Sequence, residues 1–300
     1  MARHRPRHRA RHPRLLSSVA AAVVVVALLA AVALGVWKVW RAVSPSARPA
    51  PEGCQVSASG QDYRLDLEQS SNAAIIVAES LRRGLPARAA SIALATAMQE
   101  SRLRNIDYGD RDSLGLFQQR PSQGWGTQAQ VMDPWYSSGR FYEELVKFGN
   151  WKTLPINDAA QQVQRSGVPD GYAKHEAAAR AWASALTGHS PGALSCVNRS
   201  TETASAATLA GTARKGLDGR AEVTVSGTTV SVTGKDATLV RAGVALLMAS
   251  TTLAPISAAT APDGHWAADQ DHYAAWSPSA GPSASPAPSG SPARGSVTLR

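Results

Sequence analysis

The chain begins with one long apolar stretch and continues with segments whose apolar residues recur at helical spacing. Residues 15–37 carry no charge, and as a helix they are long enough to cross a hydrocarbon core of about 30 Å. Beyond this stretch, apolar residues three and four positions apart indicate amphipathic helices that pack against a core. Helices bounded by Gly, Pro or Asn signals are predicted at residues 72–83, 86–103, 133–148, 157–165 and 172–186.

The pattern changes after Cys196. Residues 221–226 and 229–233 alternate between apolar and polar positions on either side of a Gly-Thr pair, which predicts a β-hairpin. Further helices are expected at residues 203–214 and 236–253.

Beyond the apolar stretch, these elements divide the chain into four predicted regions. Residues 38–53 contain three prolines and form a linker, and residues 54–196 form a mainly α domain. Residues 197–276 form a small α+β module. Residues 277–300 are rich in Pro, Ser, Gly and Ala, and a disordered tail is expected there because such a composition buries little apolar surface.

Composition and charge narrow the class of protein. With 300 residues, of which 44% are hydrophobic and 18% charged, the chain is sufficient for one or two globular domains. The net charge is +9, but eight basic residues lie within the first 41 positions and no acidic residue precedes Glu52. The rest of the chain is almost neutral, whereas a nucleic-acid-binding protein concentrates basic residues on its folded domain. No nucleic-acid partner is therefore expected.

The apolar stretch predicts a transmembrane helix over residues 15–37. Residues 1–14 contain six Arg, and Trp37 and Trp40 stand where an interfacial aromatic belt is found. The positive charge before the stretch favours a single-pass protein with a cytoplasmic N-terminus and extracytoplasmic domains. The alternative is a secreted protein with a cleaved signal peptide, because residues 31–33 (Ala-Val-Ala) resemble a cleavage site.

The chain has two cysteines, Cys54 and Cys196, which bracket the mainly α domain. Export would place them in a compartment that permits disulfides. A disulfide between them is predicted, and the chain-entropy model gives up to about 5 kcal/mol for closing so long a loop. Two unpaired buried cysteines are the alternative.

A carboxylate stands near the end of the second predicted helix. Residues 97–101 read Ala-Met-Gln-Glu-Ser, and residues 115–119 read Gly-Leu-Phe-Gln-Gln. Burial at the end of an apolar helix disfavours an ionised carboxylate and raises its pKa, as a general acid requires. Glu100 is therefore the candidate catalytic acid, and a solvated surface residue is the alternative interpretation.

The pair Glu100-Ser101 and the run Gly115-Leu116-Phe117-Gln118 resemble the lysozyme-like superfamily, within it the branch of soluble lytic transglycosylases and goose-type lysozymes. In that branch a Glu-Ser pair closes a helix, and a Gly-Leu-(Met/Phe)-Gln turn lines the sugar cleft. The resemblance covers residues 67–186. It implies a lysozyme-like domain that cleaves peptidoglycan glycan strands with Glu100 as acid and base, and it implies that Ser101 and the 115–118 turn belong to the substrate site.

The third element of that family is an Ala-Tyr-Asn-Ala-Gly turn followed by a tyrosine. Here residues 162–166 read Gln-Val-Gln-Arg-Ser, and Tyr172 stands where the tyrosine is expected. Gln164 and Tyr172 are therefore predicted to hydrogen-bond either the sugar or Glu100. Helix capping and packing are the alternative roles.

Glycoside hydrolysis commonly uses two carboxylates, whose separation decides the stereochemistry. Asp107, Asp110 and Asp112 offer a second carboxylate, although three acids in a loop are more often solvated or order the loop. The resemblance to lytic transglycosylases implies a single Glu, with the 6-hydroxyl of the substrate as the attacking group. Hydrolysis and transglycosylation both stay open.

Several aromatic and amide side chains complete the predicted site. Trp125 and Tyr108 are expected to stack on sugar rings, while Gln118 and Gln119 meet the sugar hydroxyls. The other tryptophans of the mainly α domain are expected in its core: Trp135, Trp151 and Trp182.

The second module carries His265, Trp266, His272 and Trp276, for which packing is favoured over a ligand surface. Zinc-ligand spacing, a P-loop and a nucleophile elbow are all missing from the sequence, and acid/base cleavage of a glycoside needs no metal. No metal and no cofactor are expected.

Together these features predict an enzyme anchored in a bacterial cell membrane that cleaves the β-1,4 bond between N-acetylmuramic acid and N-acetylglucosamine. An excess of Arg over Lys and abundant Ala are typical of a high-GC bacterium. One alternative is a catalytically inactive cell-wall-binding or assembly protein with a lysozyme-like fold. Another is a membrane transport or sensor component that works with partner subunits.

Overall fold

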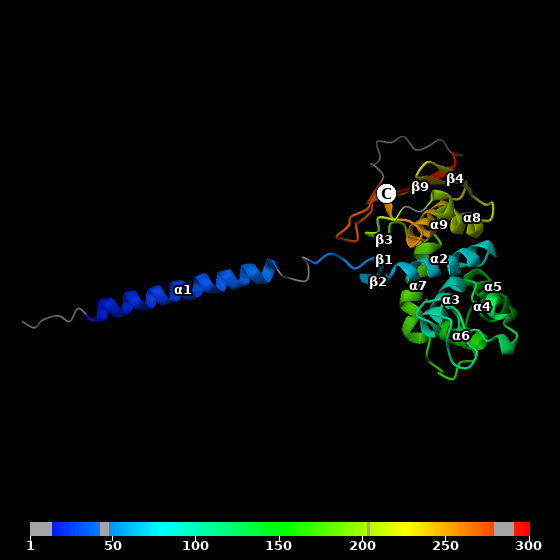
Figure 1. Cartoon of the computed structure of the whole chain (residues 1–300), viewed down its shortest axis with the longest axis horizontal. Helices are drawn as coiled ribbons and strands as arrows, with labels where there is room; N and C mark the ends of the chain where they lie inside the picture. The colour runs from blue at the N-terminus through cyan, green and yellow to red at the C-terminus, as the bar shows by residue number, and fades with distance from the viewer. Residues whose placement is uncertain (1–13, 43–47, 203–204, 279–290) are drawn as a thin grey trace, which may run out of the picture. The chain divides into compact units, whose positions relative to one another are not determined.

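The computed structural model describes residues 14–42, 48–202, 205–278 and 291–300. The chain forms two compact units, Met1–Pro49 and Ala50–Arg300 (Figure 1). The predicted regions 54–196 and 197–276 therefore belong to one compact unit.

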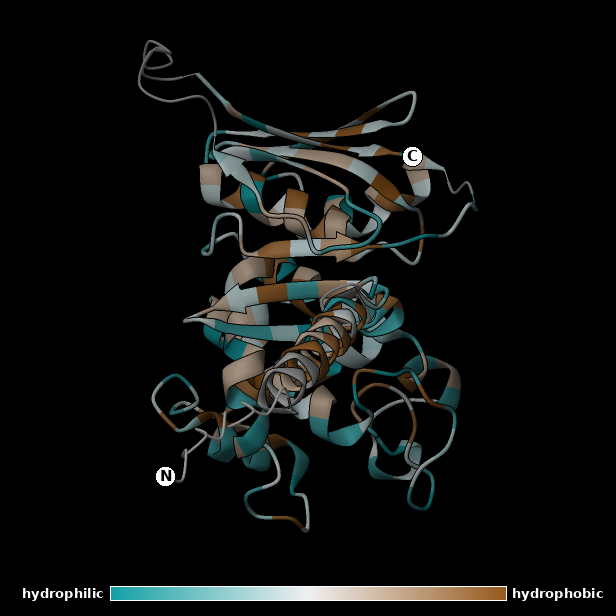
Figure 2. Cartoon of the chain, turned by 90° about the vertical axis from the view of Figure 1, so that its left-hand side faces the viewer, coloured by the Kyte–Doolittle hydropathy of each residue, from teal (hydrophilic) through white to brown (hydrophobic). Residues whose placement is uncertain are grey.

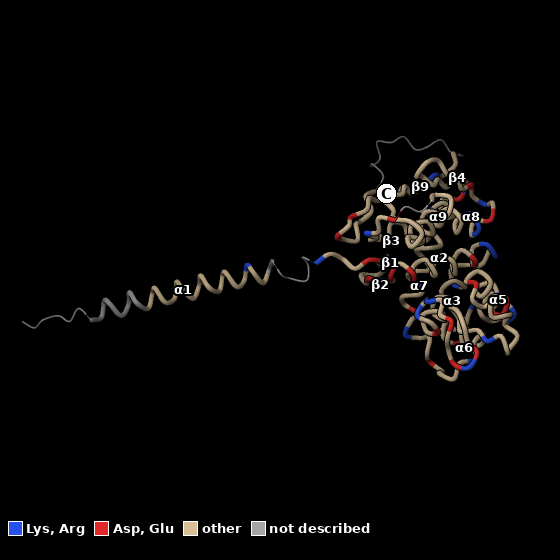
Figure 3. The backbone as a smooth tube through the Cα atoms, in the orientation of Figure 1, with Lys and Arg blue, Asp and Glu red and all other residues tan. Residues whose placement is uncertain are grey.

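The first unit contains helix α1 (Arg14–Ala42), which is apolar over most of its length (Figure 2). Within it, Ala22–Trp40 is long and apolar enough to cross a membrane, and Lys38 is the charge near its end (Figure 3). The predicted apolar helix is confirmed, and it continues five residues past position 37. Both a membrane anchor and a signal sequence have this length and composition.

The first half of the second unit is mainly helical. Asp66 begins the first of its helices with a capping box, in which its side chain accepts from the Gln69 amide and the Gln69 side chain accepts from the Asp66 amide. This cap explains why that helix starts before the predicted residue 72. The helices are α2 (Leu67–Arg82), α3 (Ala87–Glu100), α4 (Gln128–Val131), α5 (Pro134–Lys147), α6 (Ile156–Gln164) and α7 (Glu176–Leu186), with 3₁₀ turns η2 (Pro121–Gln123) and η3 (Ala173–His175).

A small antiparallel sheet, which the sequence pattern did not indicate, joins the ends of this half. It has the order β2-β1-β3, with β1 (Gly53–Ala58), β2 (Gln61–Leu65) and β3 (Leu194–Val197). Cys54 and Cys196 are direct cross-strand partners and form a disulfide. The Sγ atom of Cys196 lies 3.5 Å from the carbonyl oxygen of Met248, so the disulfide also contacts the C-terminal half.

In the C-terminal half, two helices pack against an antiparallel sheet. Among the described residues, six strands form this sheet in the order β4-β5-β9-β6-β7-β8. Its strands alternate between apolar and polar residues in Figure 2, as expected for a sheet with one covered face. The elements are α8 (Ala206–Leu217), β4 (Glu222–Ser226), β5 (Thr229–Gly234), α9 (Ala237–Ala249), β6 (Ile256–Ala261), β7 (Gly264–Ala267), β8 (Ser277–Pro278) and β9 (Ala293–Leu299).

A disordered tail was predicted over residues 277–300, and this prediction was wrong for Ala293–Leu299, which form strand β9. Strand β9 pairs with β5 on one side and with β6 on the other, and its residues Val297 and Leu299 are buried. The composition of the whole segment concealed seven residues that alternate between polar and apolar positions. Residues 279–290, which contain much of the Pro- and Ser-rich sequence, lie outside the described residues.

Helix α2 lies between the two halves. In Figure 1, α8, α9 and the six-stranded sheet lie on one side of α2, and α3, α5 and α6 lie on the other. Where α8 crosses α2, a Cβ atom on Gly216 would lie 2.7 Å from Cβ of Ala78, so glycine permits this close approach. The two halves share a continuous core, with α2 at its centre.

Candidate functional site

Glu100 is the last residue of α3, a helix whose preceding residues are almost all buried. The helix ends there because Arg102 and Leu103 have positive φ angles, three residues earlier than the pattern predicts. Glu100 itself is half-buried. Its carboxyl group therefore lies where the apolar helix meets the surface.

Ser101 connects this helix end to the Gly-Leu-Phe-Gln turn. Its Oγ donates a hydrogen bond to the carbonyl oxygen of Leu116 at 2.7 Å. The turn approaches the chain closely at Gly115, whose φ is +75° and where a Cβ atom would lie 2.4 Å from the carbonyl oxygen of Val131. Only glycine fits this position without strain. The two parts of the sequence motif are thus neighbours in the fold.

The side chains of Leu116 and Phe117 lie in the core. Both are fully buried, and the Phe117 ring stacks on Phe141 with centroids 4.8 Å apart. Direct sugar contact by these two side chains, as predicted, does not agree with their burial. They stabilise the turn instead, and the carbonyl oxygen of Phe117 accepts a hydrogen bond of 2.7 Å from Gln164 Nε2.

Tyr172 lies against the carboxyl group of Glu100. Its Oη donates to Glu100 Oε1 at 2.6 Å, and its ring is buried. Burial raises the pKa of Glu100 above its usual value, and the hydrogen bonds from Tyr172 and Gln164 oppose this increase without cancelling it. The pKa of the Tyr172 hydroxyl is raised well above its usual value by burial and by the neighbouring carboxylate. Tyr172 therefore stays protonated and remains a hydrogen-bond donor.

Gln164, which hydrogen-bonds Glu100, also lines a polar groove of about 470 Å³, whereas Glu100 and Tyr172 do not line this groove. Gln118, Gln119, Trp125 and Gln164 line it, as does Gln162. Within the described part of the chain, the buried Oε1 atoms of Gln119 and Gln162 have no hydrogen-bond partner. Buried polar atoms without partners are uncommon, and these two are unpaired acceptors in residues that line the groove.

Of the predicted stacking and amide residues, Tyr108 lies away from the groove, whereas Gln118 and Gln119 line it and also hydrogen-bond the protein. Tyr108 is 69% exposed and does not line the groove. Gln119 is buried, and its Nε2 donates to the carbonyl oxygen of Ser137 at 3.0 Å, so it also connects the turn to α5. Gln118 is half-buried, and its Nε2 donates to carbonyl oxygens of its own loop, those of Tyr108 and Gly115.

Of the three acidic residues in the loop, Asp112 holds the loop through hydrogen bonds, whereas Asp107 and Asp110 are exposed. Asp112 accepts hydrogen bonds from Arg120 Nε at 2.8 Å and from the backbone amide of Ser122 at 2.7 Å, and these bonds hold its pKa far below the usual value. A general base needs a pKa near the working pH, so Asp112 is poorly suited to activate water. Asp107 and Asp110 are exposed.

Sequence reasoning missed several residues around the site. His175 and Gln99 hydrogen-bond at 3.1 Å, which ties η3 to the end of α3 next to Tyr172. The far side of the groove is formed by α5 residues Arg140 and Glu144, which pair with each other. No local motif marks these residues, because tertiary packing brings them to the groove.

The structure holds no cluster of metal ligands within residues 14–42, 48–202, 205–278 and 291–300, where a cluster means three or more His, Cys, Asp or Glu side chains. Charges of both signs are interspersed over the second unit (Figure 3). Compared with protein-family models and with curated proteins, the chain has no match. The geometry thus defines a protonatable carboxyl group with a tyrosine partner, connected through Gln164 to a polar groove.

Proposed function

We propose that this protein is a membrane-anchored enzyme that cleaves the glycan strands of peptidoglycan at the β-1,4 bond between N-acetylmuramic acid and N-acetylglucosamine. The observation that carries the proposal is the half-buried Glu100 carboxyl group, with Tyr172 Oη 2.6 Å away and with Gln164 as the residue that connects it to a polar groove. The resemblance of Glu100-Ser101 and residues 115–118 to lytic transglycosylases and goose-type lysozymes supplies the substrate.

In the proposed reaction, Glu100 acts first as an acid. The neutral carboxyl group gives its proton to the glycosidic oxygen as the bond to the anomeric carbon breaks. The positive charge that develops on the sugar ring then faces a newly formed carboxylate. Tyr172 stabilises that carboxylate through its hydrogen bond, and both residues stay in place for the second step.

Glu100 then acts as a base. It accepts a proton from the 6-hydroxyl of the muramyl residue, whose oxygen attacks the anomeric carbon and forms an anhydro sugar. The low pKa of Asp112 and the exposure of Asp107 and Asp110 favour this single-carboxylate route over hydrolysis with a second carboxylate.

The apolar helix α1 fits this task as an anchor with a cytoplasmic N-terminus, because it would hold the enzyme near newly made glycan at the bacterial cell membrane. The basic residues before the helix favour this orientation. A secreted form with a cleaved signal sequence would carry the same site.

The test is mass spectrometry of purified peptidoglycan incubated with the full chain in nanodiscs, beside Glu100→Gln and the control Glu176→Gln. Glu176 is a half-exposed ion-pair residue of α7. We expect anhydromuramyl products from the parent and from Glu176→Gln, and a decrease of about 10³-fold for Glu100→Gln.

Other outcomes separate the alternatives. Reducing-end muramic acid that depends on Glu100 would identify a muramidase. Intact glycan that nonetheless co-sediments with the protein would replace the enzyme by a non-catalytic wall-binding protein. Products that persist in Glu100→Gln would contradict the assignment of Glu100.

A further inference from the structure

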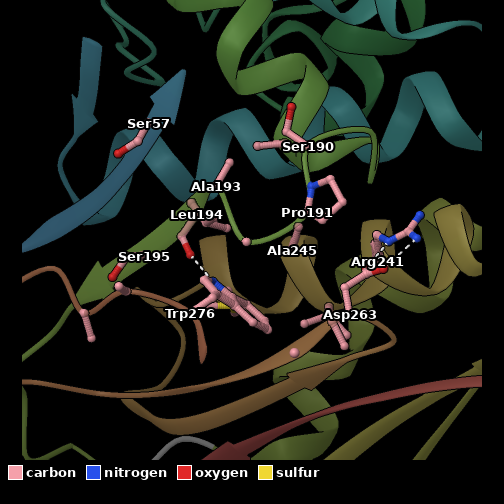
Figure 4. A pocket seen from close by; sticks show the side chains of 18 of the residues that line it. Ser57, Ser190, Pro191, Ala193, Leu194, Ser195, Arg241, Ala245, Asp263 and Trp276 are labelled. Carbon is pink, nitrogen blue, oxygen red and sulfur yellow. Dashed lines mark hydrogen bonds and ion pairs between the residues drawn. The ribbon is translucent and has the colours of Figure 1, made fainter. Parts of the chain in front are cut away.

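A second cavity, of about 530 Å³, lies between the two halves of the second unit, because residues of β1, the end of α7 and β3 line it together with residues of the C-terminal half. Its walls come from α9, the loop before β3, the β6–β7 turn and the segment Tyr273 to Pro278 (Figure 4). None of the residues that line the groove near Glu100 lines this cavity. Its volume falls within the range of small-molecule sites, roughly 300 to 1,000 Å³.

The segment that carries Trp276 is held by three hydrogen bonds from side chains. Tyr273 Oη donates to the carbonyl oxygen of Pro51 at 2.7 Å, and the buried Trp266 Nε1 donates to that of Ala274 at 3.2 Å. Trp276 Nε1 donates to the carbonyl oxygen of Leu194 at 2.7 Å (Figure 4). The indole N–H is thereby satisfied by the protein, and the half-buried ring offers the ligand an apolar surface.

A polar wall accompanies this apolar ring. Arg241 on α9 and Asp263 in the β6–β7 turn form a bidentate ion pair, drawn near Trp276 in Figure 4. The Arg241–Asp263 pair is neutral as a whole, yet it keeps donors and acceptors for further hydrogen bonds. Ser57 and Ser190 add hydroxyl groups to the lining.

The floor of the cavity is small and apolar. Val244, Ala245 and Met248 of α9 contribute it, together with Leu194. The cavity therefore combines an aromatic ring, an apolar floor and a neutral pair of planar polar side chains.

This combination selects among classes of ligand. An acyl chain would remove water from the Arg241–Asp263 pair without offering it any hydrogen bond, which is costly. An anion would meet Asp263 as well as Arg241, and a cation would meet Arg241 as well as Asp263. A neutral sugar has apolar ring faces that stack on indole and hydroxyl groups that hydrogen-bond such planar polar side chains.

We propose that the Trp276 cavity is a second, non-catalytic site that binds a neutral saccharide, with Trp276 as the stacking platform and the Arg241–Asp263 pair as the hydroxyl-binding group. This site is separate from the groove at Glu100 and does not depend on cleavage there.

The test is calorimetric titration of the full chain in nanodiscs with N,N′,N″-triacetylchitotriose, in a Glu100→Gln background that prevents turnover. Trp276→Ala should weaken binding at this site at least tenfold, whereas Trp276→Phe, which keeps an aromatic face, should weaken it less than threefold. Trp125→Ala, in the groove near Glu100, is the matched control and should leave this site unchanged.

A second variant removes space rather than a packing residue. Ala245→Met fills the cavity from α9 and should abolish binding at this site while the thermal transition stays unchanged. Unaltered affinity in both Trp276→Ala and Ala245→Met, no binding by the parent, or binding of dodecanoic acid but not of the trisaccharide would overturn the proposal. Loss of cleavage with retained Trp276-dependent binding would contradict only the proposed enzymatic function.

Discussion

The two-part motif at the Glu100 site and the Trp276 cavity are assembled over very different lengths of chain, although the bond from Tyr172 to Glu100 spans 72 residues. The hydrogen bond that joins Ser101 to the Leu116 carbonyl spans 15 residues. By contrast, the bonds that hold Trp276 to Leu194 and Tyr273 to Pro51 span 82 and 222 residues. A locally built site leaves a motif in the sequence, whereas a site built from distant segments depends on the fold of the whole unit.

The two regions also differ in charge. Glu100 is a single titratable group whose partners, Tyr172 and Gln164, are neutral, and burial raises its pKa. At the Trp276 cavity, Arg241 and Asp263 neutralise each other, and the Asp263 pKa is lowered mainly by its hydrogen bond from Arg241. The first arrangement suits proton transfer, and the second suits the binding of a neutral ligand without chemistry.

The largest expected effect follows from removing residues 291–300, which contain β9. Without this strand, β5 and β6 lose their common neighbour, and the buried side chains of Val297 and Leu299 are lost. Each such side chain contributes roughly 1.5 to 3 kcal/mol. We expect unfolding to become easier by at least about 4 kcal/mol, with a loss of saccharide binding at Trp276 that exceeds the loss of cleavage at Glu100.

Thermal denaturation followed by circular dichroism measures this effect, and neighbouring residues of β9 provide the control. Val297→Ala leaves a cavity in the core and should cost about 1 to 2 kcal/mol, whereas Thr298→Ala, at a half-exposed position, should cost less than about 0.5 kcal/mol. Equal melting temperatures for the truncated and full chains would show that β9 does not contribute to the core.

The contrast in sequence range also explains which features were predictable. Helical periodicity found α3, α5 and α6, and polar–apolar alternation found the β4–β5 hairpin, because these depend on local pattern and caps. Strands β3 and β9 escaped because their pairing partners lie far away in the sequence, whereas the β1–β2 hairpin is local and was overlooked.

The same reasoning applies to the residues of the two regions. The chemistry at Glu100 was suggested by a two-part motif, and the predicted hydrogen bond from Tyr172 is present. The burial of Leu116 and Phe117 was not foreseen, because a motif gives residue types without their orientation. Trp276 was expected to pack, since nothing local marks the cavity that it lines.

Loss of the disulfide is the next largest expected effect. The variant Cys54→Ala/Cys196→Ala should be less stable by about 3 kcal/mol, because the bond closes a long loop in the unfolded chain. Strands β1 and β3 carry Gln55, Ser57 and Leu194 of the cavity lining, so saccharide affinity should fall more than cleavage. The measurement is denaturant unfolding with calorimetric titration, and an unchanged midpoint would contradict a stabilising role for the disulfide.

Tyr172→Phe is expected to lower the cleavage rate about tenfold, which corresponds to about 1.4 kcal/mol, because the carboxylate formed in the first step loses its hydrogen bond. The hydrogen bond from Tyr172 lowers the Glu100 pKa, so its loss should raise that pKa further. Since the first step needs protonated Glu100, activity is lost as the pH rises through this pKa. The basic limb of the rate profile should therefore move to higher pH.

The control for this variant is Tyr142→Phe, which removes a buried hydroxyl that donates to the carbonyl oxygen of Ile76 rather than to Glu100. It should lower stability without moving the basic limb. A profile for Tyr172→Phe that coincides with that of the parent would exclude coupling between this tyrosine and the catalytic proton.

The smallest expected effect is a gain in stability for Glu100→Gln. Burial raises the Glu100 pKa in the folded state above the ordinary value of 4.5, because the unfolded chain solvates the ionised carboxylate better than the folded protein does. Between the ordinary and the raised pKa, the folded state binds more protons than the unfolded state, and stability therefore falls as the pH rises. Glutamine still accepts the Tyr172 hydrogen bond and carries no charge. We expect Glu100→Gln to be more stable than the parent above the raised pKa, and this gain disappears as the pH falls below the ordinary value.

Thermal denaturation at several pH values measures this gain, and Glu176→Gln serves as the control. The control loses an ion pair with Arg180 and should change stability by less than about 0.5 kcal/mol. A gain in Glu100→Gln that persists undiminished at low pH would reflect packing rather than charge. The burial that disfavours ionised Glu100 also favours the protonated carboxyl group that the first step needs. A pH-dependent gain in stability would therefore support the proposed role of Glu100 as an acid. Variants of the Arg241–Asp263 ion pair should show no comparable gain in stability, because removing either residue leaves the charge of the other unpaired.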